Sequence, residues 1–175
     1  HDYSDNYAAK TRAMELSNAL RRSQIDLFYQ PQLTAQEKVH GVEALLRWKH
    51  PVAGYIAPPV IIGLAYESGI LNELSYYLLN RACKDALEIQ KYTEKEIFLS
   101  YNLSSKQMEE EKFFEKVNEI IQSYHLKTVH LVLEVTERAA MRVSETLSQD
   151  VKILQNYGIQ FSLDDFGMGH NSILY

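Results

Sequence analysis

The feature that most constrains the fold is an alternation of short apolar runs with longer amphipathic stretches in the second half of the chain. The runs span residues 97–102, 130–135 and 159–165, and the stretches between them span residues 108–125 and 141–157. The runs have the length and composition of strands, and the stretches have the length and periodicity of helices. Strands that alternate with helices of this length predict βα units and a parallel sheet.

The first half of the chain adds elements of both kinds. They are a lead-in helix over residues 8–22, two strands over residues 26–33 and 39–48 with a tight connection, and helices over residues 58–70 and 72–92. Asn72 is the predicted N-cap of the second of these helices. Gly158 is predicted to end the last helix of the chain, because glycine readily adopts the left-handed conformation that terminates helices.

The later runs each have one uniformly apolar face. Side chains on a strand alternate between its two faces, so parity assigns each residue to a face. In all three runs the second face is mixed and ends in a polar residue, namely Asn102, Glu134 or Asp164. These residues lie at the carboxyl ends of their strands, which is where a (β/α) barrel or an open parallel sheet has its active site.

Five oxygen donors are available for such a site if Glu43 and Asp165 join these three residues. Oxygen-only ligands suit Mg²⁺, Mn²⁺ or Ca²⁺ better than zinc, which favours nitrogen and sulfur. Carboxylates gathered without cations would repel one another and raise their pKa values. Adjacent aspartates can serve two metal ions, and paired metals are the usual device for hydrolysing phosphate esters.

Each motif also has a simpler explanation. The DDFG sequence at residues 164–167 fits a strand end with an Asx turn. Glu43 fits an exposed charge on a strand, and Asn102 fits a cap of the segment that follows it. The acids of LEVTE at residues 133–137 fit a solvated strand end. The matching parity and strand-end positions favour one joint site over these separate explanations.

Composition limits the class of protein. The net charge of −5 argues weakly against duplex nucleic acid as a partner, because such proteins usually carry a basic face. Cys83 is the only cysteine and is predicted to be a buried helix thiol, whereas His50 beside Pro51 is predicted to be solvated. Neither a signal peptide nor a run of roughly 20 apolar residues is present, so the expected location is the cytoplasm.

Five motifs resemble those of EAL domains and occur in the same order. They are YQPQL, EALLRW, YNLSSKQ, LEVTE and DDFGMGHNS, at residues 29–33, 43–48, 101–107, 133–137 and 164–172. EAL domains are phosphodiesterases that open the bacterial second messenger cyclic di-GMP to a linear dinucleotide. The resemblance runs from about Leu27 to the last residue.

The resemblance implies an α/β fold, a modified (β/α)8 TIM-type barrel whose first strand runs antiparallel. The chain then divides into a lead-in helix or linker over residues 1–22 and the EAL domain over residues 23–175. A barrel of this type needs about 250 residues. We therefore expect this chain to stop after about the fifth strand, without the lysine that serves as general base in the family.

The resemblance also assigns roles to residues. The implied metal ligands are Glu43, Asn102, Glu134, Asp164 and Asp165, of which Glu43, Asp164 and Asp165 are the implied catalytic residues. The implied substrate-binding residues are Gln30, Leu46 and Arg47. The implied supports of the loop after the fifth strand are Glu137, Gly167, Gly169 and Ser172.

The implied reaction is hydrolysis of cyclic di-GMP to pGpG with a two-metal site holding Mg²⁺ or Mn²⁺, and with Ca²⁺ as an inhibitor. A homodimer, an upstream sensory or GGDEF domain, and attachment to a membrane-anchored sensor are further expectations from the family. The alternative is a non-catalytic cyclic di-GMP receptor or interaction module built on a degenerate or incomplete EAL domain. Turnover with Mn²⁺, compared with binding without turnover, distinguishes the two.

Overall fold

A computed structural model describes the backbone of residues 14–136, 145–156, 158–164 and 171–173. Within these ranges the side chains of twelve residues, including Asp164 and Ser172, are outside the description. Residues 14–21 are helical. The elements that follow are β1 (Ile25–Leu33), β2 (Val39–His50), β3 (Gly54–Ile56), α2 (Pro58–Glu67), α3 (Leu71–Gln90), β4 (Ile97–Leu103), α4 (Ser105–Met108), α5 (Phe113–Gln122), β5 (Val129–Thr136), α7 (Glu145–Asn156), β6 (Gln160–Asp164) and β7 (Asn171–Ile173).

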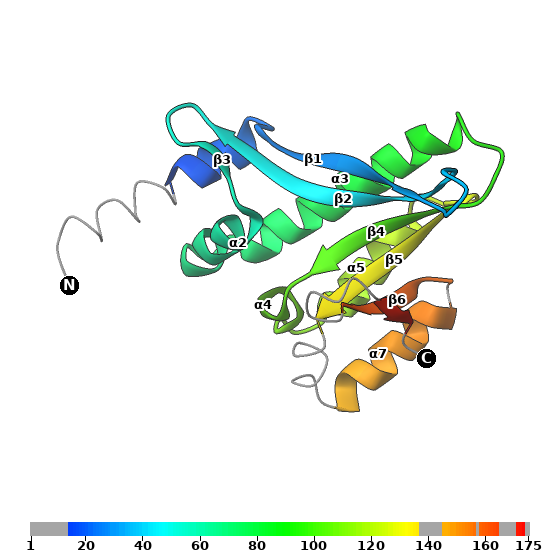
Figure 1. Cartoon of the computed structure of the whole chain (residues 1–175). Coiled ribbons are helices and arrows are strands. Elements are labelled where there is room, and N and C mark those ends of the chain that lie inside the picture. Colours follow the sequence, from blue (N-terminus) through cyan, green and yellow to red (C-terminus); the bar gives the residue numbers. More distant parts are fainter. Residues whose placement is uncertain (1–13, 137–144, 157, 165–170, 174–175) are drawn as a thin grey trace.

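The strands form one sheet in the order β1-β2-β4-β5-β6-β7, with β3 paired to β2 (Figure 1). Neighbouring strands from β2 to β6 run parallel, and β1 runs antiparallel to β2, as predicted. In the described part of the chain the sheet is open. The short strand β7 pairs antiparallel with β6 and was not predicted, since its residues read as a loop from sequence.

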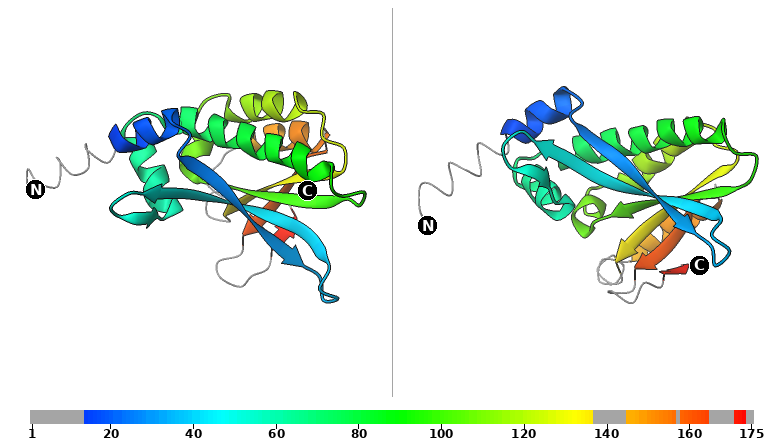
Figure 2. Two further views of the ribbon diagram at one scale, coloured as in Figure 1. Left: turned by 90° about the horizontal axis from the view of Figure 1, so that it is seen from above. Right: turned by 45° about the horizontal axis from the view of Figure 1, so that its top comes forward.

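The helices α3, α5 and α7 lie along one face of the sheet (Figure 2). The strand faces beneath them are the predicted apolar ones: Leu99 and Leu133 are fully buried, and Tyr101 is nearly so. Cys83 on α3 is also fully buried, which confirms the core thiol. One face of β4 and β5 is therefore committed to the core, and the other is left for the polar strand ends.

Two predicted helix boundaries are wrong. The helix expected over residues 108–125 is instead the single turn α4 followed by α5, and Lys112 at the break has a positive φ of 62°. The N-cap of α3 is Ile70, not Asn72, because the chain turns at Gly69 (φ 77°) and the Ile70 carbonyl already accepts the first helical hydrogen bond from Leu74 N. Periodicity alone does not reveal either turn.

Gly158 ends α7 as predicted. Its φ is 86°, and its N–H donates to the Gln155 carbonyl while Ile159 N donates to the Leu154 carbonyl. These bonds satisfy carbonyls that the helix end leaves without partners. The turn delivers the chain directly into β6.

The helix over residues 14–21 contributes three buried side chains to the hydrophobic core, those of Leu16, Ala19 and Leu20. Glu15 on this helix accepts a hydrogen bond from Nε2 of His50 at the end of β2. His50 Nδ1 also accepts hydrogen bonds from the backbone N–H groups of Val52 and Ala53. The prediction of a solvated His50 is therefore wrong, since its side chain is only 15% exposed.

Candidate functional site

The strand register brings the predicted ligands onto one face at the carboxyl ends of the strands. Glu43 on β2 lies opposite Ser100 on β4, and Asn102 lies one pleat repeat further along β4 on the same face. Asn102 is directly opposite Glu134 on β5. Glu134 is opposite Ser162 on β6. Because adjacent strands are about 4.8 Å apart, this register makes neighbours of residues that are distant in sequence.

Two of the predicted ligands are in direct contact. Asn102 Nδ2 donates a hydrogen bond of 3.3 Å to Glu43 Oε1. An amide that donates through its nitrogen keeps its carbonyl oxygen as an acceptor, which is the atom that a hard cation binds. The explanation of Asn102 as a helix cap does not hold, because Asn102 lies within β4 and the cap of the next turn is Ser104.

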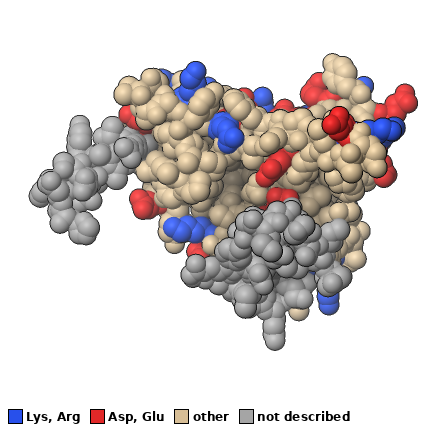
Figure 3. Space-filling model, in the orientation of Figure 1, with Lys and Arg blue, Asp and Glu red and all other residues tan. Residues whose placement is uncertain are grey.

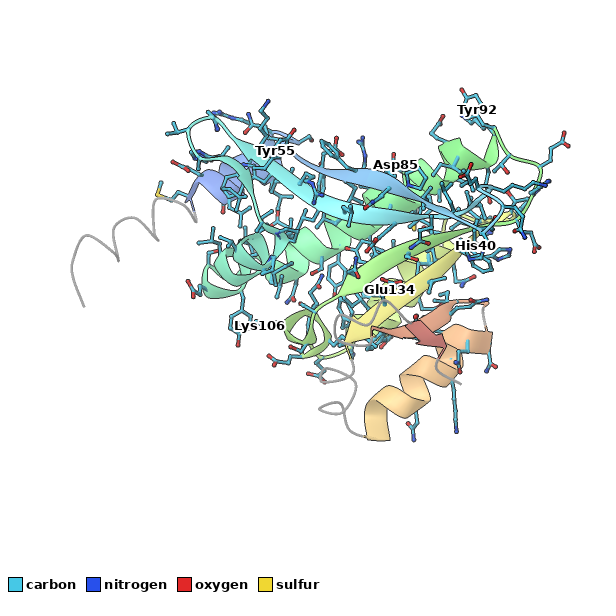
Figure 4. The ribbon with its side chains drawn as sticks, viewed as in Figure 1. His40, Tyr55, Asp85, Tyr92, Lys106 and Glu134 are labelled. Carbon is cyan, nitrogen blue, oxygen red and sulfur yellow. The ribbon has the colours of Figure 1, made fainter. Side chains whose placement is uncertain are left out.

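Glu134 is a buried carboxylate near the carboxyl end of β5, only 7% exposed (Figure 4). A buried acid is costly unless it is paired, hydrogen-bonded or bound to a metal. This burial contradicts the alternative of a solvated strand end for this residue. Acidic side chains also appear in the hollow on the face of the molecule seen in Figure 3.

A capping box fixes the chain that follows Asn102. Ser104 Oγ accepts a hydrogen bond from Gln107 N, and Ser104 N donates to Gln107 Oε1 over 2.8 Å. Gln107 is buried, and its Nε2 donates to Ser75 Oγ on α3 over 3.0 Å. The segment after β4 is thus tied to a core helix. The S-x-x-Q spacing at residues 104–107 is a sequence signal for this turn.

Two buried serines lie beside the predicted ligands and were not among the predicted site residues. Ser100 is 4% exposed and Ser162 is 3% exposed. Ser100 is opposite Glu43, and Ser162 is opposite Glu134, so both lie on the site face of the sheet. Parity assigns both serines to this face, but nothing else in the sequence distinguishes them from ordinary strand serines.

The three predicted substrate-binding residues divide between the two faces of β2. Gln30 on β1 is opposite Glu43, and Arg47 has the same parity as Glu43, so both lie on its face. The Arg47 Nη1 donates to the Leu46 carbonyl over 3.0 Å. Leu46 itself has the opposite parity and is paired with the buried Leu27.

Leu46 borders a pocket of about 430 Å³ at the carboxyl ends of β2 and β4. Pro58 and Ile62 of α2 form one wall, and Tyr101 and Asn102 form part of another. Burial raises the pKa of the Tyr101 hydroxyl above its ordinary value, so this group stays protonated at neutral pH. The pocket is mainly apolar, and Asn102 belongs both to its lining and to the predicted metal ligands. A molecule bound in the pocket would therefore also reach the predicted ligands.

Several predicted site residues lie outside the description. Asp165, Glu137, Gly167 and Gly169 are not described, and Asp164 and Ser172 are described only as backbone positions in β6 and β7. Asp164 has the same parity as Ser162 and follows it by two residues. Among the described side chains, no three His, Cys, Asp or Glu residues lie close enough to hold a metal ion.

The donors that are described still fit a hard cation. Glu43, Asn102 and Glu134 supply only oxygen to a metal ion, and the backbone of β6 carries Asp164 to the next position on the same face. Oxygen donors of this kind suit Mg²⁺ and Mn²⁺. The chemistry of the residues present is therefore consistent with the predicted metal.

The fold and the site define a class: an α/β protein with a TIM-barrel-like arrangement of parallel strands and a carboxylate–amide cluster at their carboxyl ends. Comparison with known proteins identifies the family. The EAL domain model matches residues 13–175, and the chain belongs to the EAL domain family.

Named relatives agree with this assignment. The cyclic di-GMP phosphodiesterase NbdA of Pseudomonas aeruginosa is 34% identical over 162 residues, which are 92% of this chain and 21% of NbdA. The probable cyclic di-GMP phosphodiesterase PdeG of Escherichia coli is 34% identical over 174 residues, which are 98% of this chain and 34% of PdeG. The chain thus spans between about a fifth and a third of these relatives.

A solved structure has the same fold. The PaMucR phosphodiesterase in complex with c-di-GMP superposes with a TM-score of 0.80 at 33% identity, covering 92% of this chain and 66% of that one. The EAL enzyme Bd1971 superposes with a TM-score of 0.76 at 25% identity. In the part of this chain that is described, no helix is long and apolar enough to cross a membrane.

Proposed function

We propose that this chain is the catalytic domain, or a major part of it, of a metal-dependent phosphodiesterase that hydrolyses cyclic di-GMP to pGpG. The observation that carries the proposal is the Asn102–Glu43 hydrogen bond, beside the register pair of Asn102 with the buried Glu134. Relatives named as cyclic di-GMP phosphodiesterases support the substrate.

In this proposal Glu43, Asn102 and Glu134 hold Mg²⁺ or Mn²⁺ together with Asp164 and Asp165. When bound, paired cations of this kind lower the pKa of water and stabilise the charge that develops on phosphoryl oxygens. The protein's part is to fix the donors before the cation arrives. The Asn102 amide is oriented by Glu43, and the turn after it is held by the Ser104–Gln107 capping box.

The pocket beside Asn102 supports binding of a flat apolar group such as a nucleobase. Arg47 and Gln30 lie on the face that carries Glu43, where an arginine suits a phosphate or the edge of a base. The nucleotide would then extend from the pocket across the ends of β2 and β4. From membership of the EAL domain family we further propose that Ca²⁺ inhibits the protein and that the protein forms a homodimer. We also propose that the domain is cytoplasmic and is linked to a sensory or GGDEF domain.

The test is turnover of cyclic di-GMP by the purified protein with Mn²⁺, followed as pGpG by chromatography. Asn102→Ala and Glu43→Gln should each lower the rate on the order of 100-fold, because each removes a donor to the cation. Asn72→Ala on the exposed surface of α3 is the matched control and should leave the rate unchanged. Binding of cyclic di-GMP without turnover would refute the enzyme proposal and favour the alternative of a non-catalytic receptor. Absence of binding would refute both the enzyme and the receptor.

A further inference from the structure

Ser162 is a buried polar residue whose hydroxyl has no partner among the described residues. The residue is 3% exposed, and its Oγ makes no hydrogen bond with the part of the chain that the structure describes. A buried hydroxyl without a partner is uncommon, because it loses its bonds to water and gains none in return. A binding role would explain why a serine occupies this position instead of an apolar residue.

The position of Ser162 points to the candidate site and not to the core. Phe161, its neighbour on β6, is 1% exposed and contacts Phe114 of α5 with ring centroids 5.9 Å apart. Since strand side chains alternate, Ser162 lies on the opposite face. There it is directly opposite Glu134 and two residues before Asp164, on the same face as both.

The chemistry of the proposed cation explains what a hydroxyl can do there. Mg²⁺ and related hard cations retain several waters when they bind a few carboxylates. These waters need hydrogen-bond partners on the protein, and such outer partners orient the ligands and tune the affinity. A small hydroxyl beside Glu134 offers both a donor and an acceptor without displacing a carboxylate.

We propose that Ser162 is a positioning residue of the cation site, whose hydroxyl holds a water that accompanies the divalent cation beside Glu134. This inference rests on the proposed function, because it requires a cation at the site. It assigns a role in the site to a residue that does not touch the cation. It also accounts for the missing partner of Oγ, since the partner arrives with the ion.

The proposal separates two properties that a merely structural serine would lose together. Removing a hydroxyl that has no partner costs the metal-free protein nothing, so Ser162→Ala should keep or raise its melting temperature. The same change should weaken Mn²⁺ binding by about tenfold, as expected for the loss of an outer-shell partner. Ser162→Thr retains the hydroxyl and should bind Mn²⁺ more tightly than the alanine variant.

Thr128 supplies the matched control. Its buried Oγ1 also has no hydrogen-bond partner among the described residues. Thr128 lies just before β5, at the end of the strand away from Glu134. Thr128→Val should likewise keep or raise the melting temperature of the metal-free protein. It should leave Mn²⁺ binding unchanged.

The experiment measures Mn²⁺ binding by titration calorimetry, and melting temperature after removal of metal with EDTA, for the wild type and the three variants. Unchanged Mn²⁺ affinity in Ser162→Ala would overturn the inference while leaving the proposed function intact. Loss of folding or a lower metal-free melting temperature in that variant would also overturn it, because the hydroxyl would then be structural. A wild-type protein that binds no Mn²⁺ would refute the proposed function itself, and this inference with it.

Discussion

The replacement of Gln107 by alanine should remove the connection between the end of β4 and the core. The Gln107 side chain accepts a hydrogen bond from Ser104 N over 2.8 Å and donates one to Ser75 Oγ over 3.0 Å. Gln107 is 3% exposed, so water does not readily replace it. The affected segment begins directly after Asn102 and Leu103 at the end of β4.

The expected loss follows from these two bonds. Each buried hydrogen bond contributes about 1 kcal/mol net to stability. The partly buried backbone N–H of Ser104, left without its acceptor, adds a further penalty of about 1 kcal/mol. Ser75 loses less, because its hydroxyl still donates to the Leu71 carbonyl over 2.7 Å. We expect Gln107→Ala to lower the free energy of unfolding by about 2–3 kcal/mol, or the melting temperature by roughly 4–12 °C.

Urea unfolding of the wild type, Gln107→Ala, Ser75→Ala and the double variant measures both the loss and its origin. The coupling between the two positions should be about 1 kcal/mol, since they share one hydrogen bond. Gln36→Ala in the exposed turn before β2 is the control and should change stability by less than about 0.5 kcal/mol. A loss at Gln107 as small as that control, or no coupling with Ser75, would refute the reasoning.

Three further perturbations have definite expected outcomes. Gly41→Ala should lower the free energy of unfolding in urea by about 1–3 kcal/mol, because the added Cβ would lie 2.6 Å from a backbone oxygen of β4. Gly63→Ala is the control: its added Cβ would have no atom within 4 Å, so the free energy of unfolding should stay the same or rise. Burial raises the pKa of the Cys83 thiol to about 12. At pH 8 this thiol should therefore react with a disulfide reagent only as fast as the protein opens. Fast modification of the native protein would contradict this expectation. Glu15→Gln should lower the stability measured by thermal unfolding by less than about 1 kcal/mol. His50→Ala should lower it by about 1–2 kcal/mol, because two backbone N–H groups lose their acceptor. Equal losses of stability in the two variants would argue against this account.

The strands and the face that carries the site were predictable because their signal is local. In β4 and β5, alternate residues differ so clearly in polarity that parity alone assigned Leu99 and Leu133 to the core and Asn102 to the other face. The order of the parallel strands then follows from chain order. Parity does not give the register, and the register is what pairs Asn102 with Glu134.

Elements that depend on specific turns or distant partners were not predictable in the same way. The break between α4 and α5 lies at Lys112, whose left-handed conformation does not change the apolar periodicity. The capping box at the start of α4 does have a sequence signal, the S-x-x-Q spacing, but periodicity alone does not reveal it. The partner of His50 is 35 residues away in sequence, on a helix that the sequence describes only as a helix. The strand β7 is three residues long, too short for alternation to be recognised.

The two buried serines beside the predicted ligands show why a sequence indicates such predicted ligands more readily than the residues next to them. Asn102 and Glu134 stand out because amides and carboxylates are uncommon on buried strands. Ser100 and Ser162 do not stand out, because a serine on a strand is compatible with the core, with solvent and with a site. Parity assigns both to the site face, but only strand pairing shows that they lie opposite Glu43 and Glu134, respectively. Among the described serine hydroxyls, only Ser162 Oγ is both buried and without a hydrogen-bond partner. The effect of replacing Ser162 on cation binding therefore tests whether the buried serines take part in the site or only pack beside it.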